Sequence, residues 1–318
     1  MTDLMTQLLQ GEWLRVIDVG ARGELAGRFT AFKSQVEVIG FEPDAAECAR
    51  LNGELRDSGW RKARVLPYAV GRSTTNRQFF VTEAPELSSL LEPLTEVVGR
   101  PGWRVKHVEH VDTISLDALA ARDELPQPID FLKLDTQGSE LEILRSGGET
   151  VLNGVLGVGV EVEFRELYRQ QPRFSEIEQY LRDQGFELML LEPAHLRTDW
   201  PLARKRTSYA DALFLRGHEW FIGGARADSL RRLLAIYLLH GLYAEAYALA
   251  RDSNNVAAEL IRVSYGDIQS GTLRWRFGLM IDAARCELFP NIANRHRMAR
   301  QARAVRTIDG CAWPVEPP

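Results

Sequence analysis

Short apolar runs alternate with amphipathic stretches between about residues 14 and 215. The runs Leu14–Val19, Val36–Phe41 and Val65–Val70 have the length and β-branched content of buried strands. In Asp44–Arg56 the apolar residues recur at helical spacing, and Asp44 stands where an N-cap is expected. Strands that alternate with helices in this way predict βαβ units and a mostly parallel sheet.

A different pattern interrupts this alternation. Gln78–Thr82 and Val105–Ile114 alternate polar with apolar residues around a loop rich in Pro, Glu and Ser, which predicts an antiparallel excursion near the substrate. Further strands are expected at Val155–Phe164, Phe186–Leu191 and Tyr209–Leu215. Because no helix-forming stretch separates the last two, we expect them to form an antiparallel pair that closes the sheet.

Helical spacing dominates the last third of the chain. Apolar residues recur at this spacing from Leu230 to Leu249, with Gly241 as a turn. Thr272–Arg285 and Ile292–Arg306 have helical patterns as well. The apolar stripe between residues 230 and 249 also predicts that two copies of the chain pair as a homodimer through these helices.

The pattern predicts two domains, an α/β domain over residues 1–216 and an all-helical appendage over residues 217–318. Hydrophobic residues make up 45% of the chain and charged residues 26%, as in soluble globular proteins. No apolar run approaches the roughly 20 residues that span a bilayer, and Met1–Gln10 does not resemble a signal peptide. The three cysteines are too widely spaced to indicate a disulfide framework or a zinc site. We therefore expect a cytoplasmic protein.

The net charge of −5 argues against generic binding to nucleic acid. Two basic clusters depart from that average, Arg197 with Arg204–Arg206 and the arginines of Arg295–Arg306. Each cluster is either a solvated face or a recognition surface. As a recognition surface, the first would bind an anionic group of the substrate and the second an acidic partner.

A first set of candidate residues lies where the first two apolar runs end. Asp18 and Gly20 end the first run, and Glu42 follows the second. Glycine at such a turn allows close approach of a ligand, and an acid after the second strand is placed to accept hydrogen bonds from ribose hydroxyls. The glycine fingerprint for a pyrophosphate is absent, because Arg22 and Leu25 stand where it needs glycine. S-Adenosylmethionine has no phosphate, and Asp18 is compatible with its cationic end.

A second set lies farther along the chain. Asp135 ends the apolar run Ile129–Leu134 and shares a strand face with Lys133, so the two either pair or point into a site. Glu161 and Glu163 share a face of the next expected strand. Converging acids suit a general base for a substrate hydroxyl, or a hard divalent cation. No spacing demands a metal, so we predict none and take Asp135, Glu161 and Lys133 as catalytic candidates.

The order of these motifs resembles the FkbM family of S-adenosylmethionine-dependent methyltransferases. The matching segments are Val16–Ala21, Gly40–Pro43, Ala69–Gly71, Ser88–Leu90, Thr113–Asp117, Ile129–Leu144 and Val160–Glu163. The resemblance implies a Rossmann-like class I methyltransferase fold, in which a mostly parallel seven-stranded sheet has an antiparallel last strand. It also implies O-methylation of a sugar, glycan or natural-product hydroxyl. The helical appendage lies outside it.

Site roles follow from the same resemblance, position by position. It implies Asp18, Gly20, Ala21 and Arg22 at the methionine end of the cofactor, Glu42 with Pro43 and Asp44 at the ribose, and Ala69 and Val70 near the adenine. Asp135 is expected beside the reacting methyl group. Either Asp135 or Glu161 would accept the hydroxyl proton.

Two positions depart from the family pattern. Arg22 stands where the family usually has asparagine, and Gln137 where it usually has glutamate. These departures motivate a second hypothesis, a catalytically weak cofactor-binding module whose helical appendage is an interaction surface. A nicotinamide-dependent sugar-modifying enzyme is a third hypothesis, against which the missing glycine fingerprint argues.

Overall fold

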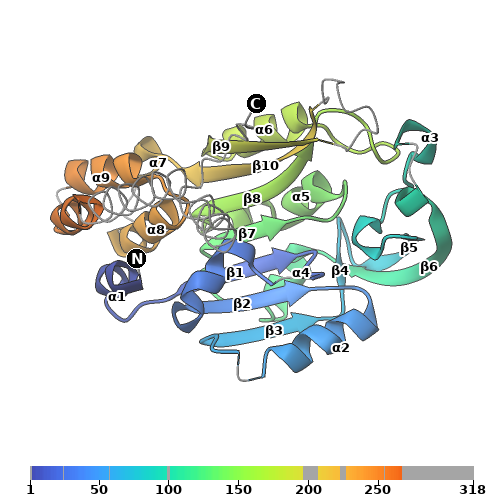
Figure 1. Ribbon diagram of the computed structural model, residues 1–318, viewed down its shortest axis with the longest axis horizontal. Coiled ribbons are helices and arrows are strands. Elements are labelled where there is room, and N and C mark those ends of the chain that lie inside the picture. The colour runs from blue at the N-terminus through green and yellow to red at the C-terminus, as the bar shows by residue number, and fades with distance from the viewer. Residues whose placement is uncertain are drawn as a thin grey trace, which may run out of the picture. The chain divides into compact units, whose positions relative to one another are not determined.

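A seven-stranded sheet with the order β3-β2-β1-β7-β8-β10-β9 organises the unit Met1–Ile236. The computed structural model describes residues 2–23, 25–56, 58–98, 101–195, 207–222, 227–253 and 255–266. Figure 1 shows the sheet from β3 at the bottom to β9 at the top. Its strands are β1 (Leu14–Val19), β2 (Val36–Phe41), β3 (Lys62–Leu66), β7 (Phe131–Leu134), β8 (Gly157–Glu163), β9 (Phe186–His195) and β10 (Thr207–Arg216).

Strand direction confirms the predicted architecture. The pairs β1–β2, β2–β3, β1–β7 and β7–β8 are parallel, whereas β10 runs antiparallel to both β8 and β9. The last strand therefore inserts between its two neighbours. The mostly parallel sheet with an antiparallel last strand is the Rossmann-like methyltransferase arrangement expected from the sequence.

The prediction of one continuous strand over Val65–Val70 is wrong. The structure divides it at Pro67 into the end of β3 and the short strand β4 (Ala69–Val70), which belongs to a different sheet. Proline has no N–H for a ladder hydrogen bond, and the Tyr68 N–H turns back to the Leu66 carbonyl over 2.9 Å. The chain leaves the main sheet at this point.

The predicted antiparallel excursion is a three-stranded sheet with the order β4-β6-β5. Strands β5 (Thr75–Thr82) and β6 (Val105–Ile114) pair antiparallel, which confirms the prediction. Their connection holds η2 (Pro85–Leu87), α3 (Thr95–Val98) and η3 (Pro101–Trp103). Trp103, Leu167 and Tyr168 form a separate small core beneath this connection.

Helices cover both faces of the main sheet. On one face α4 (Leu116–Ala121), α5 (Glu140–Leu152) and α6 (Phe174–Asp183) pack in succession over a core that includes Ile17 and Val19. On the other face, Phe29 of η1 (Gly27–Gln35) contacts Phe131 with ring centroids 4.9 Å apart. The helix α1 (Thr2–Leu9) packs on η1, and α2 (Ala45–Glu54) packs on β3.

The C-terminal part is helical where it is described. Helices α7 (His218–Ile222), α8 (Ala227–Leu239) and α9 (Tyr243–Asp252) follow β10. Gly241, with a φ of 78°, makes the predicted turn before α9. The second unit begins at Tyr237, within α8. In that unit Tyr243 and Tyr265 have ring centroids 5.4 Å apart.

Several expectations fall beyond this description. The helices predicted between residues 272 and 306 and both basic clusters lie outside the described residues. The domain assignment 1–216 and 217–318 and the homodimer remain predictions. None of the helices within the described ranges is long and apolar enough to cross a membrane.

Candidate functional site

A cavity of about 300 Å³ opens at the carboxyl ends of β1, β2, β7 and β8. Open α/β sheets bind ligands at this edge, and the volume suits a small molecule. The strand ends contribute Val19, Gly20, Phe41, Glu42, Asp135 and Glu161 to its lining. The excursion contributes the facing wall, which contains Ala69, Val70, Phe79, Pro85, Glu86, Leu87, Ser88 and Leu90.

Gly20 sets how closely the first loop approaches β7. Its φ is +84°, and a Cβ built there would lie only 1.9 Å from the Asp135 carbonyl oxygen. The Asp135 N–H in turn donates to the Val19 carbonyl over 3.0 Å. Any side chain at position 20 would push these two strand ends apart, which is the physical reason for glycine here.

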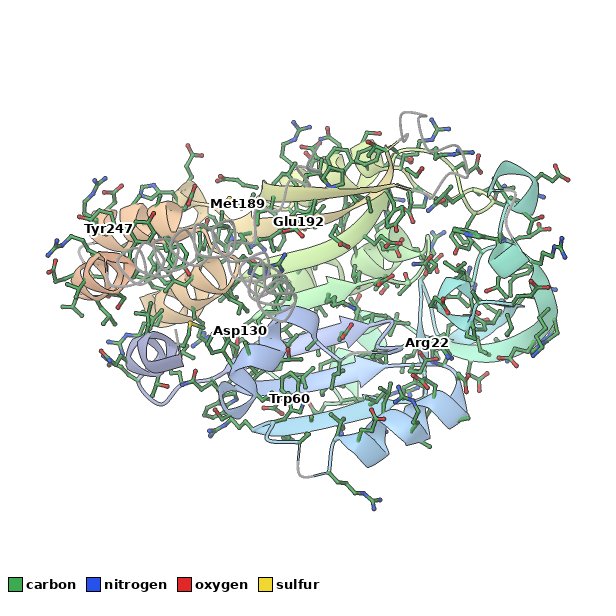
Figure 2. The ribbon with its side chains drawn as sticks, viewed as in Figure 1. Arg22, Trp60, Asp130, Met189, Glu192 and Tyr247 are labelled. Atoms are coloured by element: carbon green, nitrogen blue, oxygen red, sulfur yellow. The ribbon has the colours of Figure 1, made fainter. Side chains whose placement is uncertain are left out.

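Glu42 presents a buried carboxylate to the cavity, with only 3% of the residue exposed. Its Oε1 accepts hydrogen bonds from the Asp44 N–H over 2.9 Å and from Arg22 Nη2 over 3.3 Å. Burial raises the pKa of Glu42, and these two partners oppose that effect. Arg22, labelled in Figure 2 near the ends of the strands, thus already contacts the acid predicted to hold a ribose.

Asp44 serves the helix and Arg22 rather than the cavity lining. Its Oδ1 caps α2 by accepting from the N–H groups of Ala46 and Glu47, which confirms the predicted N-cap. Its Oδ2 accepts from Arg22 Nη2 over 2.8 Å. The hydrogen bond from Arg22 lowers the pKa of Asp44. Asp44 therefore positions the guanidinium that contacts the cavity acid.

Asp135 and Glu161 meet through a residue that the sequence analysis treated only as a departure. Gln137 Nε2 donates to Asp135 Oδ1 over 3.0 Å and to Glu161 Oε1 over 2.9 Å. All three side chains line the cavity. The structure thus brings together the two predicted acids, as their positions at the ends of adjacent parallel strands require.

Contacts from neighbouring residues hold Gln137 and its loop in place. Tyr168 Oη lies 2.9 Å from Gln137 Oε1, and Ser89 Oγ donates to the Gln137 carbonyl over 2.8 Å. Gln137 itself has a left-handed φ of 60°. The carboxylate of Glu140, at the start of α5, accepts from the N–H groups of Thr136 and Gly138 and so fixes the loop.

Burial and like charge dominate the electrostatics of this cluster. Burial, followed by the charges of Asp135 and Glu140, raises the pKa of Glu161 well above its ordinary value. Burial also raises the pKa of Glu163 and that of Tyr168 well above their usual ranges. An acid whose pKa is raised in a cleft is a candidate proton acceptor or donor.

Asp18 and Lys133 pair with each other away from the cavity lining. Asp18 is fully buried and accepts from Lys133 Nζ over 2.9 Å and from the Ala26 N–H over 2.6 Å. The register of β1 and β7 places the two side by side. Lys133 thus pairs with Asp18 and not with Asp135, the partner that one alternative gave it, whereas Asp135 lines the cavity. The cofactor role of Asp18 and the catalytic role of Lys133 remain predictions.

The predicted residues thus divide into two groups. Those that line the cavity are Gly20, Arg22, Glu42, Pro43, Ala69, Val70, Asp135 and Glu161. Asp18, Ala21, Asp44 and Lys133 lie outside the lining. Sequence reasoning missed Gln137 and Tyr168 as site residues. The only signal was the departure at position 137, since nothing in the local pattern marks Tyr168.

Comparison with known proteins bears on the same region. A family model described as the methyltransferase FkbM domain matches residues 18–188, which is more than half of the chain. The match includes the strand ends that line the cavity, from β1 to β8. Among the curated proteins the chain has no match.

Solved structures show weaker likenesses. The methyltransferase FkbM from Methylobacillus flagellatus KT is 17% identical with a TM-score of 0.40, over 64% of this chain and 43% of that one. The chain therefore spans less than half the length of that protein. The magnesium protoporphyrin IX methyltransferase from Synechocystis PCC 6803, solved with bound S-adenosylmethionine, is 10% identical with a TM-score of 0.35, over 68% and 77% of the two chains. The domain match, not these likenesses, carries the family assignment.

Proposed function

The chain belongs to the FkbM methyltransferase family, and from that premise we propose that it transfers a methyl group from S-adenosylmethionine to a hydroxyl of a sugar, glycan or natural product. The observation that carries this proposal is the meeting of Gly20, Glu42 and Asp135 at one cavity. Together they offer a close backbone approach, an acceptor for ribose hydroxyls and an acid for a cationic centre.

The residues present fit this methyl donor. Glu42, Asp135 and Glu161 give the cavity a carboxylate lining, which complements a ligand that carries a sulfonium and an ammonium group. Ala69 and Val70 supply a buried apolar surface of the kind that an adenine ring needs. Glu42 would hold the ribose, and the backbone at Gly20 would approach the methionine end.

Catalysis would rest on positioning and on one proton transfer. Bound S-adenosylmethionine supplies a methyl group made electrophilic by positive sulfur. The cavity walls hold the acceptor hydroxyl in line with that methyl group and exclude water. Asp135 or Glu161 accepts the hydroxyl proton as the new carbon–oxygen bond forms. Lys133 would act indirectly, by holding Asp18 beneath the first loop.

The excursion supports the proposed class of acceptor. Phe79, Leu87 and Leu90 provide apolar surface, while Glu86 and Ser88 provide polar groups on the same wall. A hydroxylated ring with one apolar face, such as a sugar or a polyketide, matches that combination. The expected acceptor is thus a small molecule or a glycan.

A second candidate function has specific observations in its favour. Arg22 contacts the acid predicted to hold the ribose, and a neutral amide stands at position 137 between the two catalytic acids. A protein with these features could bind the cofactor yet turn over slowly. It would then work as a binding module, with the helices after residue 216 as an interaction surface and the place where two copies pair.

Calorimetric titration with S-adenosylmethionine tests the shared premise. Glu42→Gln should weaken binding by about tenfold to a hundredfold, because hydrogen bonds to a charged acceptor are worth about 1.5 to 3 kcal/mol. Glu37→Gln is the matched control, since Glu37 lies on the same strand β2 but does not line the cavity. Its Oε1 pairs with Lys62 Nζ at a distance of 2.8 Å. Absence of binding by the unaltered protein overturns both candidate functions.

Radiolabelled S-adenosylmethionine and fractionated cell extract then separate the two candidates. Label transferred to an extract component supports the enzyme, and fragmentation mass spectrometry of the product identifies the methylated atom. Methylation on nitrogen or carbon contradicts O-methylation. Tight binding without transfer to any fraction favours the binding module.

A further inference from the structure

One side-chain amide joins two carboxylates in the cavity. Gln137 Nε2 carries two hydrogens, and it donates to Asp135 Oδ1 over 3.0 Å and to Glu161 Oε1 over 2.9 Å. Lys133 lies 2.9 Å from Asp18 instead. Within the described ranges, neither of the two bridged carboxylates forms an ion pair. The amide therefore gives the two acids hydrogen bonds but carries no charge of its own.

Glu161 has acids on several sides. The groups that influence it are Asp135 after β7, Glu140 on α5, Glu163 on its own strand, Asp211 on β10 and the Tyr168 hydroxyl. Burial is the largest cause of its raised pKa, followed by the charges of Asp135, Glu140 and Asp211. A second negative charge beside Asp135 is thus costly in the free protein. Glu161 keeps a proton to a higher pH than an ordinary glutamate.

Tyr168 contacts the end of the amide that faces away from the acids. Its hydroxyl has one hydrogen and lies 2.9 Å from each of two acceptors, Gln137 Oε1 and the carbonyl oxygen of Leu87. The Tyr168 ring is fully buried and contacts Trp103 with centroids 5.2 Å apart. With Oε1 held by a hydroxyl, the two amide hydrogens point at the carboxylates. Tyr168 also ties this amide to the cavity wall formed by Leu87.

We propose that Asp135, Gln137 and Glu161 form one proton-holding unit that is primed by the charge of the methyl donor. Gln137 is its positioning residue. It holds the two carboxylates about one amide while they share a single proton in the free protein. When a sulfonium ligand lies beside Asp135, the unit releases that proton to solvent and Glu161 becomes able to accept another. The inference rests on the proposed function, because it takes the sulfonium methyl donor as the ligand.

The proton balance closes over one turnover. Before binding, Glu161 holds the one proton of the unit. On binding, the Glu161 proton passes to water. As the acceptor oxygen bonds to the methyl carbon, the carbon–sulfur bond breaks and its electron pair stays on sulfur. The acceptor hydroxyl gives its proton to Glu161, which restores the starting state when the neutral thioether product leaves.

Two ligands that differ in one charge provide the test. S-Adenosylmethionine has a sulfonium and S-adenosylhomocysteine a neutral thioether, and both are titrated calorimetrically into the full chain in buffers of different ionisation enthalpy. We expect S-adenosylmethionine to release more protons, approaching one per site. Over the pH range in which this proton is released, the affinity for S-adenosylmethionine should rise by up to about tenfold per pH unit relative to that for S-adenosylhomocysteine.

Three variants assign the proton. Glu161→Gln should abolish the proton that Glu161 releases. Any proton that comes from the ligand itself is released with both proteins, and the difference between them removes it. Glu163→Gln is the matched control: Glu163 is another buried acid with a raised pKa on β8, but it does not line the cavity, so the difference between the ligands should persist. Gln137→Met should move the window of proton release to higher pH, because loss of the amide removes hydrogen bonds that favour the charged carboxylates.

Each outcome bears on a different claim. Binding of both ligands with equal proton release overturns the priming inference and leaves the proposed function standing. Binding of neither ligand by the unaltered protein overturns the proposed function and the inference with it. If Gln137→Met weakens both ligands equally at every pH without moving the window, Gln137 is structural and its positioning role is wrong.

Discussion

The strand β7 has an aspartate at each end, and the two carboxylates have opposite surroundings. Asp130 precedes the strand, is fully buried, and accepts hydrogen bonds from the Arg15 N–H over 2.9 Å and from Arg232 Nε over 2.8 Å. Asp135 follows the strand, lines the cavity, and accepts a hydrogen bond from the neutral amide of Gln137. One acid is paired with arginines inside the protein, whereas the other lines the cavity and forms no ion pair within the described residues.

This difference separates an acid that is paired inside the protein from one that we propose takes part in the reaction. Arg22 lines the same cavity as Asp135. Figure 2 shows Asp130 and Arg22 at opposite ends of the strands, so the surroundings of Asp130 are separate from the cavity. A buried charge is tolerated when cations and hydrogen bonds surround it. An acid without a cation costs stability, and such a cost is typical of sites where a ligand supplies the missing charge.

The largest expected effect is at Asp130. Asp130→Ala should lower the free energy of unfolding by about 3 to 5 kcal/mol, because it removes the buried carboxylate with which Arg15 and Arg232 both pair. Asp135→Ala, the counterpart at the other end of β7, should change it by less than about 1 kcal/mol. Urea unfolding at neutral pH measures both. Equal losses would contradict the distinction between the two ends.

The second effect concerns activity. Asp135→Asn should slow methyl transfer by about a hundredfold or more, roughly 2.7 kcal/mol of barrier, because an amide lacks the negative charge that the proposed unit places beside the sulfonium ligand. Its thermal unfolding should match that of the unaltered protein. Initial rates of label transfer measure the loss. Unchanged rates would remove Asp135 from the proposed mechanism.

The third prediction compares two arginines at opposite edges of the sheet. Arg232 pairs with the buried Asp130, and Arg22 pairs with Glu42 at the cavity. Its contact with Glu42 is 3.3 Å long and its side chain is 24% exposed, so the pair should contribute less than about 1 kcal/mol to stability. Arg22→Ala should instead strengthen S-adenosylmethionine binding by up to about tenfold, since it frees Glu42 for the ribose. Weaker binding measured by calorimetry would show that Arg22 assists the ligand.

The last effect is a pH dependence of stability at Glu163. Its carboxyl is buried, and among the described residues its Oε2 has no hydrogen-bond partner. Because its pKa in the folded state lies well above 4.5, the folded protein binds the proton more tightly than the unfolded chain does. Stability should therefore fall as pH rises from about 4.5 toward the folded pKa, by at most about 1.4 kcal/mol per pH unit.

Glu163→Gln removes this titration. The variant should gain stability over the unaltered protein as the pH rises, with little difference near the unfolded pKa. Urea unfolding at about pH 5 and about pH 8 measures the change. A difference that is the same at both values would mean that Glu163 does not titrate between them.

Much of the fold could be predicted because its signals are local. The bounds of β1 and β2, the N-cap at Asp44 and the turn at Gly241 follow from short-range pattern. The prediction that acids after successive parallel strands converge also holds, since parallel strands share one carboxyl edge. The division of Val65–Val70 is marked by Pro67, which has no N–H to donate to a neighbouring strand. The apolar content of the run nevertheless favoured a single strand.

The partners of charged groups could not be predicted in this way. Lys133 pairs with Asp18 across 115 residues of chain, and Arg232 reaches Asp130 across 102. Such contacts depend on which elements the fold places side by side, and no periodicity records them. Gln137 was visible only as a departure from the family pattern. Its hydrogen bonds to two acids required the loop geometry that Glu140 and Tyr168 impose.

The sheet, its antiparallel last strand and the edge where a ligand can bind follow from the amino-acid pattern, because alternation, glycine and strand-terminal acids act over a few residues. The surroundings of each acid depend instead on the three-dimensional fold. Asp130 and Asp135 are the same side chain at the two ends of one strand. Their electrostatic surroundings differ because Coulomb interactions depend on distance in space rather than along the chain. One aspartate is buried beside arginines, and the other lines the cavity.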